Sequence, residues 1–226
     1  MTSSFTPPAP LQTAVLFVVF NRPDTTVQVF EAIRQAKPPR LYVAADGPRE
    51  GREGEADRVA KVREIATAVD WPCEVKTLFR ENNLGCKYAV SGAITWFFEQ
   101  EEQGIILEDD CLPSQSFFWF CEELLNRYKN DFRIWHISGN NFYYTTKTAI
   151  ESYTFGGIFG SIWGWASWSS RWSQYDAEMT MFEEVLENQL LQYAYGGGSV
   201  VRSRLRDFWE IRHGLDTWDY QWVFCR

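Results

Sequence analysis

Four short strand-like segments separated by helix-like segments constrain the fold of this chain more than any other feature. The first, residues 14–20, is a continuous apolar run rich in β-branched residues, which is typical of a strand buried on both faces of a parallel sheet. Further strands are expected over 41–45, 74–79 and 104–108. Four strand–helix units with short connections predict an α/β doubly wound sheet with right-handed crossovers.

The segments between these runs predict the helices of the sheet's two covering layers. Asp24 can cap a first helix that ends near Ala36, with Val27, Phe30 and Ile33 at helical spacing on its apolar side. The other helices are expected over 57–69, over 86–99, and from Ser114 or Ser116 to about Tyr128.

The pattern changes after Phe132. A short strand is expected over 134–137, a stretch rich in Gly, Trp and Ser covers 153–175, and helices are expected over 180–193 and 199–212. The Trp163–Trp165 stretch is compatible with two roles: it can line a ligand cleft, or it can clamp a loop beneath the sheet. Both stay open at the level of sequence.

Polar clusters follow three of the predicted strands: Asn21-Arg22-Pro23, Asp46-Gly47 and Glu108-Asp109-Asp110. Ligands of doubly wound sheets bind beyond the carboxyl ends of the strands, so these clusters predict a site there. Three neighbouring carboxylates repel one another unless a cation is close, and their hard oxygens favour Mg²⁺ or Mn²⁺. A solvated, helix-capping loop is the alternative for the acidic cluster.

Composition excludes several classes of protein. The net charge of −8 leaves no basic surface for nucleic acid. There is neither a G-x-G-x-x-G nor a Walker A motif, and no apolar run approaches the roughly 18 residues that span a bilayer. The five cysteines lack C-x-x-C spacing, which disfavours zinc and disulfides and predicts a cytoplasmic protein, with peripheral membrane association through a partner left open.

Six motifs follow one another along the chain: Phe20-Asn21-Arg22-Pro23, Ala45-Asp46-Gly47-Pro48-Arg49, Asn82-Asn83-Leu84-Gly85, Leu107-Glu108-Asp109-Asp110, Trp163-Gly164-Trp165-Ala166-Ser167-Trp168 and Trp218-Asp219-Tyr220. In this order they resemble the GT-A glycosyltransferases of the nucleotide-diphospho-sugar transferase superfamily, most closely bacterial relatives of the N-acetylglucosaminyltransferase I type. The resemblance implies a Rossmann-like, mostly parallel central sheet flanked by helices, with a Trp/Gly-rich acceptor-side region towards the C-terminus.

The resemblance also implies a domain organisation. We expect a flexible segment over 1–12 and one GT-A domain over 13–226, divided into a nucleotide-binding half (1–132) and an acceptor-side half (133–226). Members of the family usually continue beyond the position of Arg226, so we expect the acceptor-side half to be shortened.

By the same resemblance, three residues are assigned to the nucleotide. Arg22 would contact the nucleotide or its phosphates, Asp46 would accept a hydrogen bond from a uracil-type base, and Lys87 would approach the diphosphate. Each has a simpler alternative from the residues alone. Arg22 and Lys87 can be solvated surface charges, and Asp46-Gly47 is a common turn pair.

Three further carboxylates are assigned to the metal and to proton transfer. Asp109 and Asp110 occupy a DxD-like position, with Asp110 as the direct metal ligand and Asp109 closer to the ribose. Asp219 matches the catalytic base of inverting members; it can also be a helix N-cap, and Asp216 is a competing candidate for the base.

These assignments predict a metal-dependent transferase that uses Mn²⁺ or Mg²⁺. It would move a hexosyl or N-acetylhexosaminyl group, with inversion, from a UDP-linked donor to a hydroxyl of a glycan, a lipid-linked acceptor or a protein. A sugar-1-phosphate nucleotidyltransferase is an alternative, although it needs a glycine-rich, basic loop after the first strand. A catalytically inactive sugar- or nucleotide-binding module of the same fold is the non-enzyme alternative.

Overall fold

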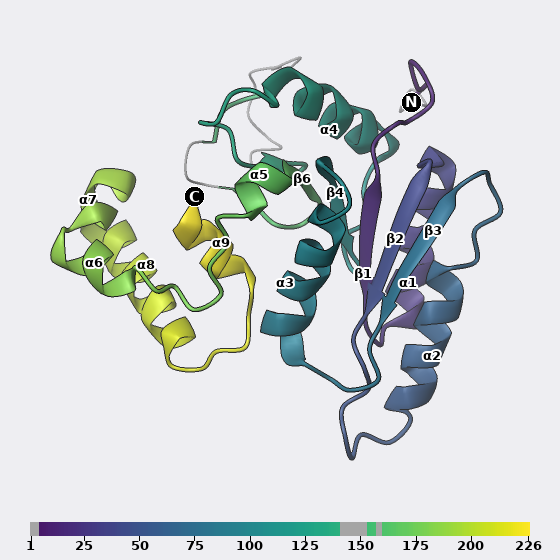
Figure 1. The fold of residues 1–226 in the computed structure, drawn as a ribbon, viewed down its shortest axis with the longest axis horizontal. Coiled ribbons are helices and arrows are strands. Elements are labelled where there is room, and N and C mark those ends of the chain that lie inside the picture. The colour runs from purple at the N-terminus through teal and green to yellow at the C-terminus, as the bar shows by residue number, and fades with distance from the viewer. Residues whose placement is uncertain (1–4, 141–152, 157–159) are drawn as a thin grey trace.

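The central element of the protein is a six-stranded sheet, seen in a computed structural model that describes residues 5–140, 153–156 and 160–226 (Figure 1). The strands lie in the order β3-β2-β1-β4-β6-β5. Their bounds are β1 Val15–Val19, β2 Arg40–Ala45, β3 Glu74–Phe79, β4 Gln103–Glu108, β5 Ile137–Ser138 and β6 Trp165–Trp168.

The first four strands are parallel, and the last two are added in the opposite direction. Val15 of β1 lies opposite Leu41 of β2 on one side and Ile105 of β4 on the other. β6 pairs antiparallel with both β4 and β5. The expected architecture, a mostly parallel α/β sheet flanked by helices, is therefore confirmed.

Helices cover both faces of this sheet and bury its apolar strands (Figure 1). One face packs against α1 (Pro23–Ala36), α2 (Glu55–Ala66) and α4 (Gln115–Tyr128). The other packs against α3 (Gly85–Phe98), α5 (Ser169–Trp172) and α9 (Asp219–Cys225). Strands β1, β2 and β4 are buried on both sides, so their sequences are largely apolar without alternation. The edge strand β3 has no fully buried residue, and its sequence mixes charged and apolar residues.

A tryptophan cluster fills the second face beside β6. Trp165 is fully buried and stacks on Trp218, with ring centroids 5.8 Å apart. Trp172 and Trp222 pack against the same ring. Trp163, by contrast, is 57% exposed. Trp165 is thus a core residue, and only Trp163 of this stretch faces solvent.

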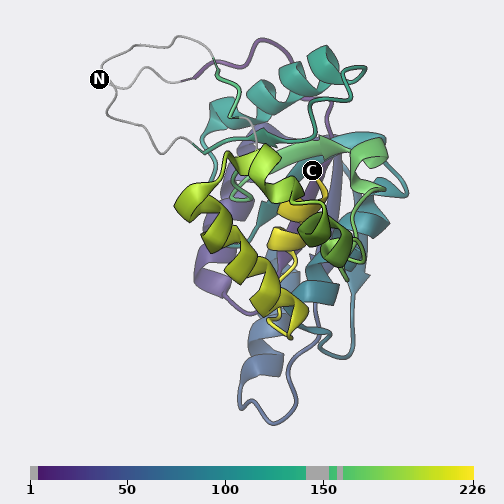
Figure 2. The ribbon, with the colours of Figure 1, turned by 90° about the vertical axis from the view of Figure 1, so that its left-hand side faces the viewer.

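The helices α6 (Phe182–Glu187), α7 (Leu190–Tyr195) and α8 (Gly198–Arg212) form a smaller apolar cluster of their own. Tyr220, Val223 and Phe224 of α9 pack against this cluster. In Figure 2 these three helices stand in front of α9. Helix α9 therefore contacts the sheet layer on one side and the small helical cluster on the other.

Several local expectations were wrong. Pro23 is the first residue of α1, so Arg22 rather than Asp24 takes the N-cap position. Val27 is 49% exposed, because Val29, Phe30 and Ile33 form the buried side of α1. The strand expected over 134–137 is reduced to the two residues of β5, and α2 begins at Glu55, two residues earlier than expected.

The segment before β1 contacts α4 where it is described. Trp119 donates its indole N–H to the carbonyl of Ala9 at 2.7 Å, and Leu11 is 2% exposed. Glu122 accepts hydrogen bonds from the backbone of Gln12 and Thr13. Residues 1–4 of the segment expected to be flexible lie outside the described residues.

Candidate active site

A cavity of about 270 Å³ opens at the carboxyl ends of β1, β2 and β4. This is where the strand order reverses, since β2 and β4 lie on opposite sides of β1. The charged and polar residues that line the cavity come from the ends of four strands, from the loops that follow them, and from the segment before α9. They are Arg22, Asp46, Arg49, Arg80, Asn83, Glu108, Asp109, Asp110 and Asp216.

Arg22 joins the loop after β1 to the acidic cluster after β4. One guanidinium nitrogen lies 2.6 Å from Asp110 Oδ2 and 3.3 Å from Asp109 Oδ1. The guanidinium therefore supplies the positive charge that the carboxylates require. About half of the Arg22 side chain is exposed, so it can turn towards a ligand without disturbing the core.

The two aspartates differ in their freedom to bind a ligand. Asp109 is buried, and its Oδ2 accepts the backbone N–H of Phe20 at 3.1 Å. Burial raises the pKa of Asp109, while the charge of Arg22 opposes this shift. Asp110 has a side chain that is 51% exposed, and its Oδ2 contacts the movable Arg22. Asp110 is thus the more accessible oxygen donor.

Glu108 is the carboxylate of the cavity whose ionised form is strongly disfavoured. Burial, together with the charges of Asp110, Asp109 and Asp219, raises its pKa to about 8. A neutral Glu108 at pH 7 removes one of the three negative charges at the end of β4. The shift also indicates that the Asp219 carboxylate is close enough to Glu108 to repel it.

The donor set suits a metal that is shared with a diphosphate better than one held by protein alone. Within the described parts of the chain, no three carboxylate, histidine or cysteine side chains are arranged to hold an ion. Mg²⁺ and Mn²⁺ at nucleotide sites need only one or two carboxylates, because phosphates and water complete the coordination. Asp110, with Asp109 beside it, fits that requirement.

Asp46 connects β2 to the start of α3. Its two oxygens lie 3.1 and 2.9 Å from the backbone nitrogen of Leu84, and burial raises its pKa. Asn83 donates to the carbonyl of Gly47 at 2.8 Å. A Cβ on Gly47 would lie 2.5 Å from the backbone of Asn82, so only glycine permits this approach. The Asp46 carboxylate therefore lies in the cavity wall and is held in place by its hydrogen bonds to the Leu84 backbone.

Glu55 supports the loops around the cavity without lining it, and the sequence did not reveal this role. It is fully buried, and it accepts hydrogen bonds from Asn21 Nδ2 at 2.8 Å, from the Arg49 backbone at 2.7 Å and from the Arg49 guanidinium at 2.5 Å. These bonds lower its pKa to about 2. Glu55 therefore ties the loops after β1 and β2 to α2. Nothing in its sequence context signals this role, because its partners come from two other segments.

Arg49 and Arg80 add positive charge to the cavity wall. Arg49 lies over the Phe20 ring, with its guanidinium carbon 5.5 Å from the ring centroid. Arg80 follows β3, and its guanidinium donates to the carbonyl of Ala89. Arg80 could have been found by the rule that polar residues at strand ends form the site.

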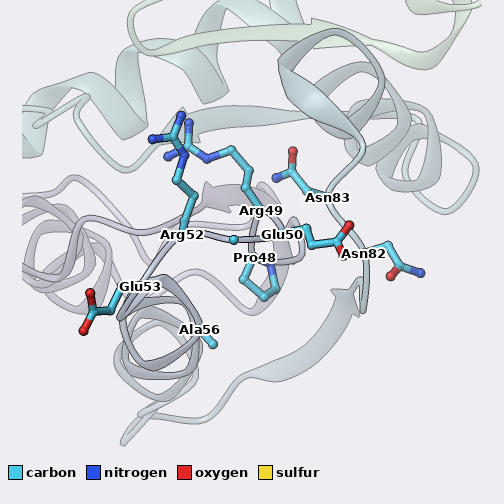
Figure 3. Close-up of a pocket in the computed structure, with 9 residues that line it drawn as sticks. Pro48, Arg49, Glu50, Arg52, Glu53, Ala56, Asn82 and Asn83 are labelled. Atoms are coloured by element: carbon cyan, nitrogen blue, oxygen red, sulfur yellow. The ribbon is translucent and has the colours of Figure 1, made fainter.

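A second, larger hollow of about 780 Å³ lies beside the first and shares Arg49 and Asn83 with it. Its wall is the loop after β2 and the turn before α3. Figure 3 shows Arg49 and Arg52 extending in the same direction from this loop. The hollow is an open extension of the cavity.

Lys87 is not brought to the acidic cluster. Its ammonium lies 2.8 Å from Glu178 Oε1, and Tyr88 donates to the same oxygen. Lys87 is absent from the lining of both hollows. Its expected contact with a diphosphate therefore requires the Lys87–Glu178 pair to open.

Asp216 and Asp219, the two candidate bases, have different surroundings. Asp216 accepts the backbone N–H groups of Cys86 and Lys87, each at 2.8 Å, at the start of α3. Asp219 is the first residue of α9 and accepts the hydroxyl of Thr217. Asp219 does not line the cavity, although its charge acts on Glu108.

No family model matches the sequence, and no curated protein is similar to it. Among solved structures, the galactosyltransferase LgtC in complex with donor and acceptor sugar analogues is similar over 77% of this chain, with 12% identity and a TM-score of 0.41. The chain covers 64% of the LgtC chain. This similarity is too low to assign an activity.

No helix in the described ranges has both the length and the apolar character needed to cross a bilayer.

Proposed function

We propose that the chain is a glycosyltransferase of GT-A architecture that binds a nucleotide-diphosphate sugar and a divalent cation in the cavity at the ends of β1, β2 and β4. One observation carries the proposal. Arg22, Asp46, Asp109 and Asp110 come from the ends of three different strands and line the same cavity. The cavity thus combines cationic groups for phosphates with oxygen donors for a metal.

Sugar transfer requires that the negative charge developing on the leaving diphosphate be neutralised on one side of the sugar. Arg22 can leave Asp110 and bind the leaving diphosphate, since its side chain is half exposed. Asp110 then becomes free to hold Mn²⁺ or Mg²⁺, with Asp109 fixed beside it by Phe20. A metal bound there would act as a Lewis acid that stabilises the charge on the leaving group.

The other side of the sugar needs a base for the acceptor hydroxyl. We assign this role to Asp219, because its charge reaches the cavity at Glu108 and because both oxygens of Asp216 already hold the backbone of α3. A base on the face opposite the leaving group implies inversion. A UDP-linked hexose or N-acetylhexosamine is the donor we propose, and a hydroxyl of a glycan, lipid-linked carrier or protein is the acceptor.

The connection after β1 disfavours a sugar-1-phosphate nucleotidyltransferase. Only Phe20, Asn21 and Arg22 separate β1 from α1, which leaves no room for a glycine-rich phosphate loop. An inactive module with the same cavity is the remaining alternative. It would bind the nucleotide and transfer nothing.

Calorimetry with Mn²⁺ and UDP tests the proposal. UDP should bind more tightly with Mn²⁺ than without it, and Asp110→Ala should remove this gain. Asp131→Ala, which removes a carboxylate paired with Arg133 away from the cavity, is the matched control. Equal UDP binding by Asp110→Ala and wild type would exclude the metal role. A failure of UDP, GDP, CMP and dTDP to bind with Mn²⁺ would exclude the proposed function.

A further inference from the structure

Two segments that are about 130 residues apart in the sequence meet at the start of α3. Asp216, in the loop between α8 and α9, accepts Cys86 N–H through Oδ2 and Lys87 N–H through Oδ1, both at 2.8 Å. These N–H groups belong to the first turn of α3 and have no partner within the helix. The Asp216 carboxylate thus caps α3 from a distant part of the chain.

The turn before α3 is built to admit this carboxylate. A Cβ on Gly85 would lie 2.7 Å from Asp216 Oδ2. Gly85 also has a φ of +79°, a left-handed conformation that favours glycine. Any larger residue would displace Asp216 from the helix. On the other side of the turn, Asp46 binds the backbone N–H of Leu84. The start of α3 is therefore held between a carboxylate from each half of the chain.

The loop that carries Asp216 leads directly to the proposed base. Trp218 is 2% exposed and stacks on Trp165, which fixes the loop to the sheet layer. Thr217 donates its hydroxyl to Asp219 at the start of α9. Asp216, Trp218 and Asp219 therefore lie on one short, constrained segment, and Asp216 is its contact with the cavity wall.

We propose that Asp216 is a positioning residue that holds residues 214–219, and with them Asp219, in register with the donor cavity. The inference rests on the proposed function. Both Asp216 oxygens are engaged by α3, so its part is to join the two segments and not to move a proton. When the contact is lost, Asp219 shifts relative to the sugar while Arg22, Asp109 and Asp110 keep their places.

Displacement of a reacting group by about 1 Å lowers turnover by up to roughly 100-fold. We therefore expect Asp216→Ala to lower kcat by about 10- to 100-fold, with a change in donor KM of about threefold or less. Asp216→Asn keeps one acceptor oxygen of the same shape, so its kcat should lie between those of wild type and Asp216→Ala. Calorimetric UDP stoichiometry should stay unchanged, which separates this effect from a loss of folded protein.

Asp176→Asn is the matched control. The Asp176 carboxylate accepts the backbone N–H groups of Glu178 and Thr180 at 2.9 and 2.6 Å, in a turn that does not line the cavity. Hydrogen exchange supplies a readout that needs no activity. In Asp216→Ala, the amides of Cys86, Lys87 and 214–219 should exchange at least about tenfold faster, while those of α1 and β1 stay as in wild type.

Three results would overturn the proposal: a kcat of Asp216→Ala within about twofold of wild type, an equal loss in Asp176→Asn, or unchanged exchange at Cys86 and Lys87. If the wild type transfers no sugar, the proposed function fails, and the exchange measurement still decides whether Asp216 joins the two segments. Faster exchange throughout the protein would show general destabilisation and would also reject the positioning role.

Discussion

The Arg22 guanidinium, which follows β1, lies 2.6 Å from the Asp110 carboxylate, which follows β4. This pair spans the point at which the strand order reverses. Arg22, the group expected to bind a diphosphate, thus forms an ion pair with Asp110, the group expected to bind a metal. The Arg22–Asp110 pair therefore competes with both proposed ligands, and it must separate when a metal binds Asp110 and a diphosphate binds Arg22.

Replacing Arg22 should affect metal and nucleotide in opposite directions. Arg22→Gln removes a charge-assisted phosphate contact worth about 1.5–3 kcal/mol, which corresponds to roughly 10- to 100-fold weaker UDP binding. The same variant leaves Asp109 and Asp110 without their cation, so Mn²⁺ alone should bind more tightly. Calorimetry measures the UDP affinity and the Mn²⁺ affinity. Arg34→Gln, which breaks the exposed ion pair with Asp70, is the control. Unchanged UDP affinity would remove Arg22 from the site.

Asp219→Asn should separate binding from transfer. The amide keeps the shape of the carboxylate but cannot accept the acceptor's proton, so kcat should fall by about 100-fold or more. UDP and Mn²⁺ affinities should stay within about twofold of wild type, because Asp219 does not line the cavity. Steady-state kinetics with calorimetry checks both. Retained transfer would place the base elsewhere.

Glu108 should make the protein less stable as the pH rises. Its pKa is about 8 in the folded chain against 4.5 in the unfolded one, so between these values only the folded state keeps the proton. Unfolding therefore becomes easier from about pH 4.5 upward until the pH passes 8. Glu108→Gln lacks this penalty.

The Tm advantage of Glu108→Gln over wild type should accordingly be larger at pH 8 than at pH 5, by several degrees, since about 1 kcal/mol corresponds to roughly 2–4 °C for a chain of this length. Thermal melts at both pH values test this. Glu123→Gln, on the exposed side of α4, should show the same Tm difference at both. A Glu108→Gln advantage that does not grow with pH would contradict the expected shift.

Gly47 should tolerate no side chain. In Gly47→Ala the new Cβ would lie 2.5 Å from backbone atoms of Glu81 and Asn82, and such overpacking costs about 1–3 kcal/mol. The Tm should therefore fall. The UDP affinity should also fall, because the shifted turn carries Asn83, which lines the cavity. Gly51→Ala is the control, since its Cβ meets nothing within 4 Å and only its φ of +71° adds strain of about 1 kcal/mol. Equal losses in both variants would contradict the close approach.

The central strands of the sheet could be predicted because they are buried on both faces, and the run over 14–20 contains β1. The segment over 74–79 coincides with β3, although this edge strand is largely exposed. Local sequence also predicted which residues stand at strand ends, and the sheet brings Arg22, Asp46, Asp109 and Asp110 to one cavity. By contrast, β5 and β6 pair although they are far apart in the sequence, and this pairing leaves no local pattern.

The sequence by itself determined the α/β class and the polar strand ends, because burial on both faces and strand termination are local properties of the chain. Only the tertiary structure decided the partners of the charged groups. Lys87 pairs with Glu178, Glu55 joins two loops, and Asp216 caps α3, each across a sequence separation that no periodicity encodes. A charge binds whichever opposite charge or free N–H group the folded sheet places beside it, so these roles arise only with the fold.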